Sequence, residues 1–153
     1  MKKIILIAGT RPEVIKLAPI YRAMRESALL APVFLSTGQH REMLMQACDA
    51  FGIRPDHDLG LMTHGQSLPA LTARVVEAVS SFLRKEAPDA VLCQGDTTTV
   101  LASALGAFYE GIPVGHVEAG GRRGAEHGGG ELTEVPADVV ADTGLQCRRL
   151  RHA

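Results

Sequence analysis

Ile4-Ile-Leu-Ile-Ala-Gly-Thr-Arg-Pro-Glu13 is the stretch of sequence that decides the fold. Its first half, residues 4–8, has the length and the β-branched content of a strand that is buried on both faces. Gly9 then permits a sharp turn, and Thr10 and Glu13 have the spacing of a capping box at a helix start. The stretch therefore predicts a buried strand that leads directly into a helix.

The same order of elements repeats through the first 120 residues. Strands separated by helices of ten or more residues form right-handed crossovers and a parallel sheet, so the predicted class is α/β with a doubly wound parallel sheet. In the helix expected at 67–87, an apolar stripe at spacings of three and four should pack on the sheet; it comprises Leu68, Leu71, Val75, Val79 and Leu83. The strands are predicted at 3–8, 32–37, 89–94 and 113–118, with a short one within 56–62, and the helices at 11–27, 40–51, 67–87 and 98–110.

Composition narrows the class of protein. The chain has 153 residues, enough for one domain, and its 16 Lys and Arg balance 17 Asp and Glu, so neither nucleic acid nor an anionic membrane is an expected partner. Its three cysteines lack metal-ligand spacing, which favours buried, reduced thiols in a cytoplasmic protein. We expect no metal site and no membrane-spanning segment. A nicotinamide cofactor is not expected either, because the first turn lacks a three-glycine fingerprint.

Charged side chains follow three of the predicted strands. Arg11 and Lys16 come after the first strand, Asp96 follows the third, and Glu118 ends the fourth. Because ligands of open α/β sheets bind at the carboxyl ends of the strands, two carboxylates and two cations would face one crevice. This set suits proton transfer beside an anionic substrate, although internal salt bridges, or capping of a helix by Asp96 or Thr97, would explain the same residues.

A polar turn also follows the second strand. Thr37-Gly-Gln-His40 could line a ligand, but a single histidine at a helix start is more typical of a surface or capping residue.

Five motifs, taken in order, resemble those of the non-hydrolysing UDP-N-acetylglucosamine 2-epimerase family. The resemblance covers residues 2–120. It implies the amino-terminal, Rossmann-like half, residues 1–120, of a two-domain glycosyltransferase-B-type fold. The motifs are Gly9-Thr-Arg-Pro-Glu13, Thr37-Gly-Gln-His-Arg-Glu-Met43, Gly65-Gln-Ser-Leu68, Gln94-Gly-Asp-Thr-Thr-Thr99 and Gly115-His-Val-Glu-Ala-Gly120.

The resemblance implies an isomerase that interconverts UDP-N-acetylglucosamine and UDP-N-acetylmannosamine for bacterial surface polysaccharides. The implied route eliminates UDP to give a 2-acetamidoglucal and then adds UDP back, with no cofactor. The partners are then UDP-N-acetylglucosamine and UDP. Matching site residues are Asp96 and Glu118 for catalysis, Arg11 and Lys16 for binding the substrate, and Gln39, His40 and Gln66 for a second, activating UDP-N-acetylglucosamine.

The match stops after Gly120. Residues 121–153 form a Gly- and Arg-rich tail, predicted to be loop or disordered, and neither the family's proline-glutamate-glutamate motif nor its carboxyl-terminal UDP-binding domain is found. A shift of reading frame would produce such a break. We therefore expect an epimerase domain that is inactive as this chain alone and could form a homodimer through an uncovered face. The alternative is a non-catalytic nucleotide-sugar-binding or regulatory domain; a glycosyltransferase fragment shares the fold but not the motifs.

Overall fold

The computed structural model describes residues 1–39, 41–63, 65–117, 133–134 and 147–149. Five strands run parallel in the order β3-β2-β1-β4-β5, so the crossovers extend from the central β1 in both directions. This arrangement confirms the predicted doubly wound α/β class. The elements are β1 (Lys2–Ala8), α1 (Arg11–Glu26), β2 (Leu30–Ser36), α2 (Arg41–Ala50), β3 (His57–Asp58), α3 (Leu68–Glu86), β4 (Ala90–Gln94), α4 (Thr98–Tyr109) and β5 (Val114–Val117).

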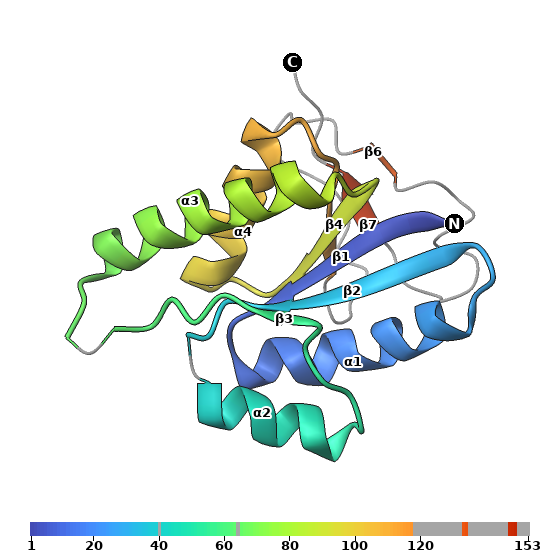
Figure 1. Ribbon diagram of the computed structural model, residues 1–153, viewed down its shortest axis with the longest axis horizontal. Helices are drawn as coiled ribbons and strands as arrows, with labels where there is room; N and C mark the ends of the chain where they lie inside the picture. The colour runs from blue at the N-terminus through green and yellow to red at the C-terminus, as the bar shows by residue number, and fades with distance from the viewer. Residues whose placement is uncertain (40, 64, 118–132, 135–146, 150–153) are drawn as a thin grey trace, which may run out of the picture.

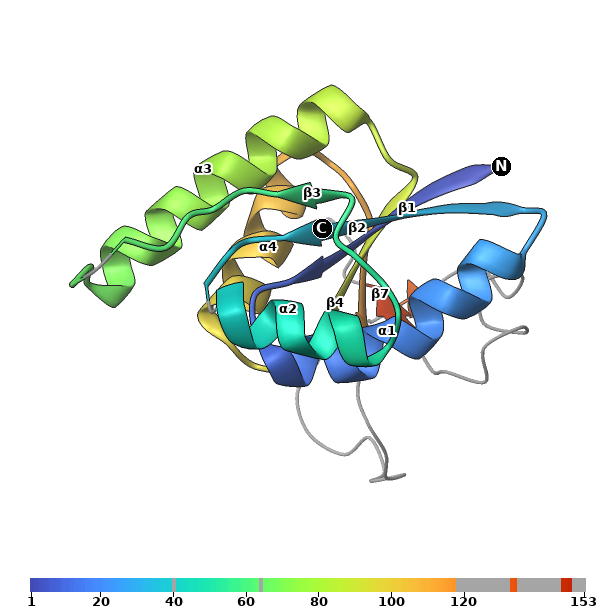
Figure 2. The same ribbon diagram turned by 60° about the horizontal axis from the view of Figure 1, so that its bottom comes forward.

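Two helices cover each face of the sheet (Figures 1 and 2). Successive side chains of a strand point to opposite faces, so Ile4 and Leu6 of β1 pack with α1 and α2, whereas Ile5 and Ile7 pack with α3 and α4. All four are at most 2% exposed. The run of apolar residues that predicted a strand buried on both faces is therefore the centre of two apolar layers.

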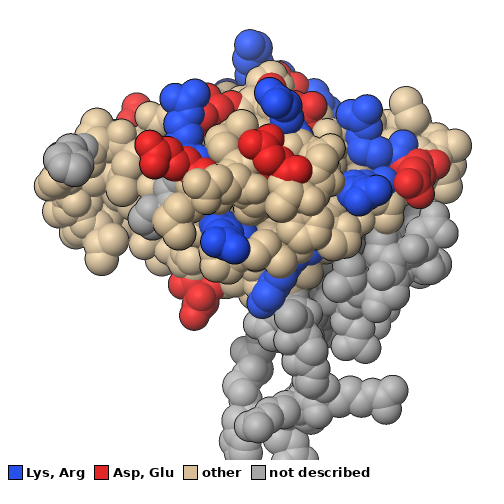
Figure 3. Space-filling model, turned by 90° about the horizontal axis from the view of Figure 1, so that it is seen from below, with Lys and Arg blue, Asp and Glu red and all other residues tan. Residues whose placement is uncertain are grey.

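The outer face formed by α1 and α2 carries charges of both signs. Lys and Arg lie among Asp and Glu across this face, without a large area of one sign (Figure 3). On this side, the described residues therefore form no extended basic surface.

Element positions follow the sequence prediction closely, with one correction in α3. Leu71, Val75, Val79 and Leu83 are buried as predicted, but Leu68 is 66% exposed. Leu68 is the first residue of α3, and this end of the helix extends past the sheet (Figure 1). Helical periodicity places Leu68 on the correct side of the helix but contains no information about where the sheet ends.

Two short strands belong to the segment after residue 120. β7 (Cys147–Arg149) pairs antiparallel with β5, and β6 (Thr133–Glu134) pairs antiparallel with β7. The remaining residues of the predicted loop or disordered tail lie outside the described part of the chain. The boundary at residue 120 stays a prediction.

Two of the three cysteines are buried free thiols. Cys48 of α2 and Cys93 of β4 are at most 1% exposed. Burial, with a smaller effect of Asp49, raises the pKa of the Cys48 thiol to about 11. Burial, with a smaller effect of Glu13, raises the pKa of the Cys93 thiol to about 12. Both behave as small apolar side chains, as expected. In the described part of the chain, no helix is long and apolar enough to cross a membrane.

These thiols should resist labelling in the folded chain. Because the raised pKa keeps both groups protonated up to mildly alkaline pH, a Cys147→Ser variant should react with a thiol reagent at pH 8 only after urea unfolds it. The Cys147→Ser variant in urea is the control for complete reaction. Rapid labelling of its native form would contradict the burial of Cys48 and Cys93.

Candidate functional site

Three loops meet where β1, β2 and β4 end. β1 pairs with β2 on one side and with β4 on the other, so the carboxyl ends of these parallel strands share one edge of the sheet. The loops comprise residues 9–10, 37–39 and 95–97. Edges of this kind are where open α/β sheets bind ligands, so the candidate site is built here.

A buried carboxylate organises the first loop. Glu13 is 1% exposed, and its Oε2 accepts hydrogen bonds from the backbone N–H groups of Gly9 at 2.6 Å and Thr10 at 3.0 Å. This is the Glu13 half of the predicted capping box. The Thr10 hydroxyl faces the backbone of Glu13, but it is buried without a well-formed hydrogen bond. Glu13 therefore closes the turn between β1 and α1.

The same carboxylate reaches the loop that follows β4. Thr97 donates its hydroxyl proton to Glu13 Oε1 at 2.6 Å, across 84 residues of sequence. Thr97 Oγ1 also accepts from the backbone N–H of Val100 at 3.4 Å and is the N-cap of α4. Since Thr97 caps the helix, capping does not explain Asp96.

Threonine hydroxyls connect the loop after β2 to the start of α4. Thr37 and Thr99 lie 3.3 Å apart through their Oγ1 atoms, and Thr99 Oγ1 donates to Gln39 Oε1 at 2.6 Å. A Cβ added to Gly9 would overlap the hydroxyls of both threonines. Only glycine leaves room for the loops after β1, β2 and β4 to pack against one another at this point.

Three charged residues predicted for the site lie exposed around this packed centre. Arg11 is the first residue of α1, Lys16 lies a turn and a half further on, and Asp96 precedes Thr97. Within the described ranges, none of the three forms an ion pair. In these ranges Asp96 thus does not form the internal salt bridge that was the alternative to a ligand site. Its carboxylate is available to a ligand.

Gln94 holds Lys16 near the loop that carries Asp96. The amide is assigned with its oxygen toward Lys16, because Oε1 then accepts from Lys16 Nζ and from the backbone N–H of Gly95, both at 3.1 Å. Gln94 is 5% exposed, so an oxygen facing these donors satisfies a buried acceptor. The Lys16 ammonium is thereby placed at the carboxyl end of β4.

The remaining predicted residues fall into two groups. Glu118 and His40 lie outside the described residues. Gln39 lies at the shared edge and bonds to Thr99, whereas Gln66 lies in the loop that precedes α3. Gln66 accepts from Thr63 Oγ1 at 2.8 Å and contacts the Met62 sulfur at 3.0 Å. Among the described residues, Gln39 and Gln66 have no hydrogen-bond partner in common.

His116 of β5 is a further polar contributor to the site. Its Nε2 lies 2.7 Å from the carbonyl oxygen of Gly95. A carbonyl only accepts, so Nε2 donates. Gly95 has φ +98°, which a residue with a side chain rarely adopts. His116 thus holds the backbone immediately before Asp96.

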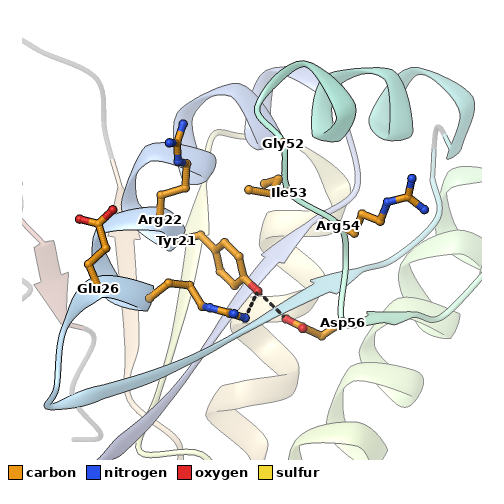
Figure 4. A pocket seen from close by; sticks show the side chains of 8 residues that line it. Tyr21, Arg22, Glu26, Gly52, Ile53, Arg54 and Asp56 are labelled. Carbon is orange, nitrogen blue, oxygen red and sulfur yellow. Dashed lines mark hydrogen bonds between the residues drawn. The ribbon is translucent and has the colours of Figure 1, made fainter.

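A separate groove lies between the second half of α1 and the loop after α2 (Figure 4). Its volume is about 400 Å³. At its floor the Tyr21 hydroxyl donates to Asp56 Oδ2 at 3.1 Å, and Asp56 also accepts from the backbone N–H of Phe34 at 2.7 Å. Burial, and then the Asp56 charge, raise the pKa of Tyr21. The polar groups at the floor are thus used in joining α1 to β2. The lining residues are Tyr21, Arg22, Arg25, Glu26, Gly52, Ile53, Arg54 and Asp56.

Metal binding has no support in the part of the chain that the structure describes. No group of three or more His, Cys, Asp or Glu side chains there could hold an ion.

Comparison with known proteins assigns the family. The family model described as UDP-N-acetylglucosamine 2-epimerase matches residues 22–134. The UDP-N-acetylglucosamine 2-epimerases of Escherichia coli K12 and Salmonella typhimurium are each 48% identical over 122 residues, which are 80% of this chain and 32% of theirs. The chain therefore spans about a third of the length of these relatives.

Solved structures agree. A UDP-GlcNAc 2-epimerase from Neisseria meningitidis, crystallised with UDP-GlcNAc, is 43% identical with a TM-score of 0.73, covering 77% of this chain and 32% of that one. MurG from Acinetobacter baumannii, at 17% identity and a TM-score of 0.59 over 74% of this chain and 34% of its own, shares the fold alone. The sheet is thus of the glycosyltransferase-B type, and the chain belongs to the UDP-N-acetylglucosamine 2-epimerase family.

Proposed function

We propose that this chain forms the amino-terminal half of the active site of a UDP-N-acetylglucosamine 2-epimerase. Arg11 and Lys16 bind the diphosphate, and Asp96 and Glu118 transfer protons at sugar C2. The observation that carries the proposal is the edge of the sheet where Arg11 and Asp96 flank loops that share the buried Glu13 carboxylate; both are exposed and form no ion pair with another described residue. The Neisseria meningitidis relative was crystallised with this nucleotide sugar.

The proposed reaction has two steps. One carboxylate takes the proton from C2 while the bond between C1 and the UDP oxygen breaks, and UDP leaves with the electron pair as 2-acetamidoglucal forms. UDP then bonds to C1 again while C2 receives a proton on its opposite face. Because the leaving group is a diphosphate, cations beside it stabilise the charge that develops in the transition state.

Side chains, and not the turn after β1, must bind the phosphates. The N–H groups of Gly9 and Thr10 already donate to Glu13, so they are not available to an anion as the amides of a glycine-rich phosphate loop would be. Arg11 and Lys16 remain at the start of α1, where the helix dipole adds favourable potential for a diphosphate. Because side chains and not backbone N–H groups contact the phosphates, we expect the loss of Arg11 to weaken nucleotide-sugar binding most.

Turnover by the 153-residue chain alone is not part of the proposal. The matched segment is only 32% of these relatives, so this chain supplies only part of their cleft. The alternative function, nucleotide-sugar binding without catalysis, uses the same rim of residues. Binding and turnover must therefore be measured separately.

A second UDP-N-acetylglucosamine bound by Gln39, His40 and Gln66 stays a proposal. Gln39 supports it in part, since Thr99 occupies its Oε1 while its NH₂ group has no acceptor among the described residues. A free amide donor at the edge of the site could bind a ligand oxygen.

We also propose a homodimer and a cytoplasmic location. Leu101, Leu105 and Tyr109 form an apolar stripe on α4, in which Leu101 is 65% and Tyr109 63% exposed. Such a stripe has no charges that would repel the same stripe of a second copy around a two-fold axis. For the location, the support is that Cys48 and Cys93 are free thiols, as in proteins of a reducing compartment.

Titration of the chain with UDP-N-acetylglucosamine tests the function. Calorimetry should show binding that Arg11→Ala weakens about tenfold, because charge-assisted hydrogen bonds to phosphate are lost. Arg22→Ala is the matched control, since Arg22 is also exposed on α1 but faces the groove at its other half. In deuterated water, the chain alone should add no deuterium at C2.

Absence of binding would contradict both the active-site half and the binding-domain alternative. Deuterium incorporation at an enzymatic rate would contradict the inactivity of the isolated chain, and Asp96→Asn should then abolish it.

Sedimentation equilibrium tests the dimer. We expect a dimer that Leu101→Asp converts to a monomer, since a charge would be desolvated in the apolar interface. Leu29→Asp is the control, because Leu29 is equally exposed at 65% but lies before β2. A monomer at all concentrations, or equal effects of the two substitutions, would contradict the interface.

A further inference from the structure

Glu13 differs from an ordinary capping residue in using both of its carboxylate oxygens. Oε2 accepts from the N–H groups of Gly9 and Thr10, and Oε1 accepts from the hydroxyl of Thr97. Capping of α1 accounts for the contacts of Oε2. It does not account for the bond to Thr97, which joins the start of α1 to the start of α4.

The environment of Glu13 leaves little freedom for this arrangement to change. The side chain is 1% exposed, and a buried carboxylate without hydrogen-bond donors is strongly destabilising. In the described part of the chain its donors are two backbone N–H groups and one hydroxyl, with no cation. If the two loops separated, Oε1 would lose its donor and water would have to enter.

Asp96 lies between two anchored neighbours. Gly95 is held through its carbonyl oxygen by His116, at 2.7 Å, and Thr97 is held through its hydroxyl by Glu13, at 2.6 Å. At the start of α1, Arg11 lies between Thr10 and Glu13 in the sequence, one residue from an anchored N–H group. The backbone under each charged residue is therefore fixed, while its own side chain remains exposed.

We propose that Glu13 is a positioning residue for the site: through Thr97, its carboxylate sets the spacing between Arg11 and Asp96. This inference rests on the proposed function, because the spacing matters only if one ligand contacts both side chains. In that case Arg11 and the diphosphate it binds locate the sugar relative to Asp96. Small displacements of a group from its reacting position can cost large factors in rate.

Substitution of Thr97 separates this role from helix capping. Thr97→Val removes the hydroxyl that donates to Glu13, whereas Thr97→Ser keeps it. Ser67→Ala is the matched control: Ser67 is the N-cap of α3 and accepts from the N–H of Ala70 at 3.4 Å, so its loss removes a cap without touching the candidate site.

The first readout is the ¹H–¹⁵N spectrum without ligand. If the link exists, Thr97→Val should shift the amide signals of Gly9 and Thr10, 84 or more residues away in sequence, because their shared acceptor loses a partner. Thr97→Ser and Ser67→Ala should leave these two signals in place. Shifts confined to the first turn of α4 would overturn the link.

Glu13→Gln tests the hydrogen bond between Thr97 and Glu13 by changing its acceptor instead of its donor. The amide oxygen can still accept from Gly9 and Thr10, but the NH₂ group presents donors to a threonine hydroxyl that already accepts from Val100. We expect the amide signals of Asp96 and Thr97 to shift, whereas Glu42→Gln, which changes an exposed carboxylate in the first turn of α2, should not shift them. Unmoved Asp96 and Thr97 signals would overturn the proposal.

The second readout is affinity for UDP-N-acetylglucosamine. Thr97→Val should weaken binding about tenfold, and Thr97→Ser should restore it. Equal affinities for these variants would overturn the positioning role while leaving the proposed function in place. Absence of binding by the unaltered chain would instead overturn the proposed function, whatever the amide signals show.

Discussion

The buried carboxylate of Glu13 must have its hydrogen-bond donors, and the loops at the candidate site are arranged to supply them. Removing an ion from water costs several kcal/mol unless the lost hydration is replaced. Here Gly9, Thr10 and Thr97 replace it. This requirement fixes the turn after β1 and brings the start of α4 to the start of α1. The exposed charges of Arg11 and Asp96 are placed as a consequence.

Most of the fold could be predicted from the sequence because its signals are local. Residues 4–8 are apolar without alternation, as a strand between two helical layers requires, and α3 repeats its apolar residues every three or four positions. Leu68 shows where this reasoning fails. Its position in the repeat is correct, but burial depends on the extent of the sheet beneath the helix, which the repeat does not encode.

The candidate site was predictable only in part. Arg11, Lys16 and Asp96 follow strands directly, so the rule that ligands bind at the carboxyl ends of parallel strands is sufficient to select them. The second role of Glu13 was not predictable in this way, since Thr97 is 84 residues distant and no local pattern connects the two. The sequence contains one indication of this second role, because Glu13 lies beside the buried residues Val14 and Leu17. The capping box, however, already accounts for a glutamate at this position.

A double-mutant cycle on Glu13 and Thr97 would test the central claim most directly. The free energy of unfolding would be measured in urea for the unaltered chain, Glu13→Ala, Thr97→Ala and the double variant. Because the N-cap of α4 is lost with Thr97 in both backgrounds, its contribution cancels. A hydrogen bond to a buried carboxylate predicts a coupling energy of about 1.5–3 kcal/mol. Effects that add to within about 0.5 kcal/mol would contradict the claim that Glu13 holds the two loops together.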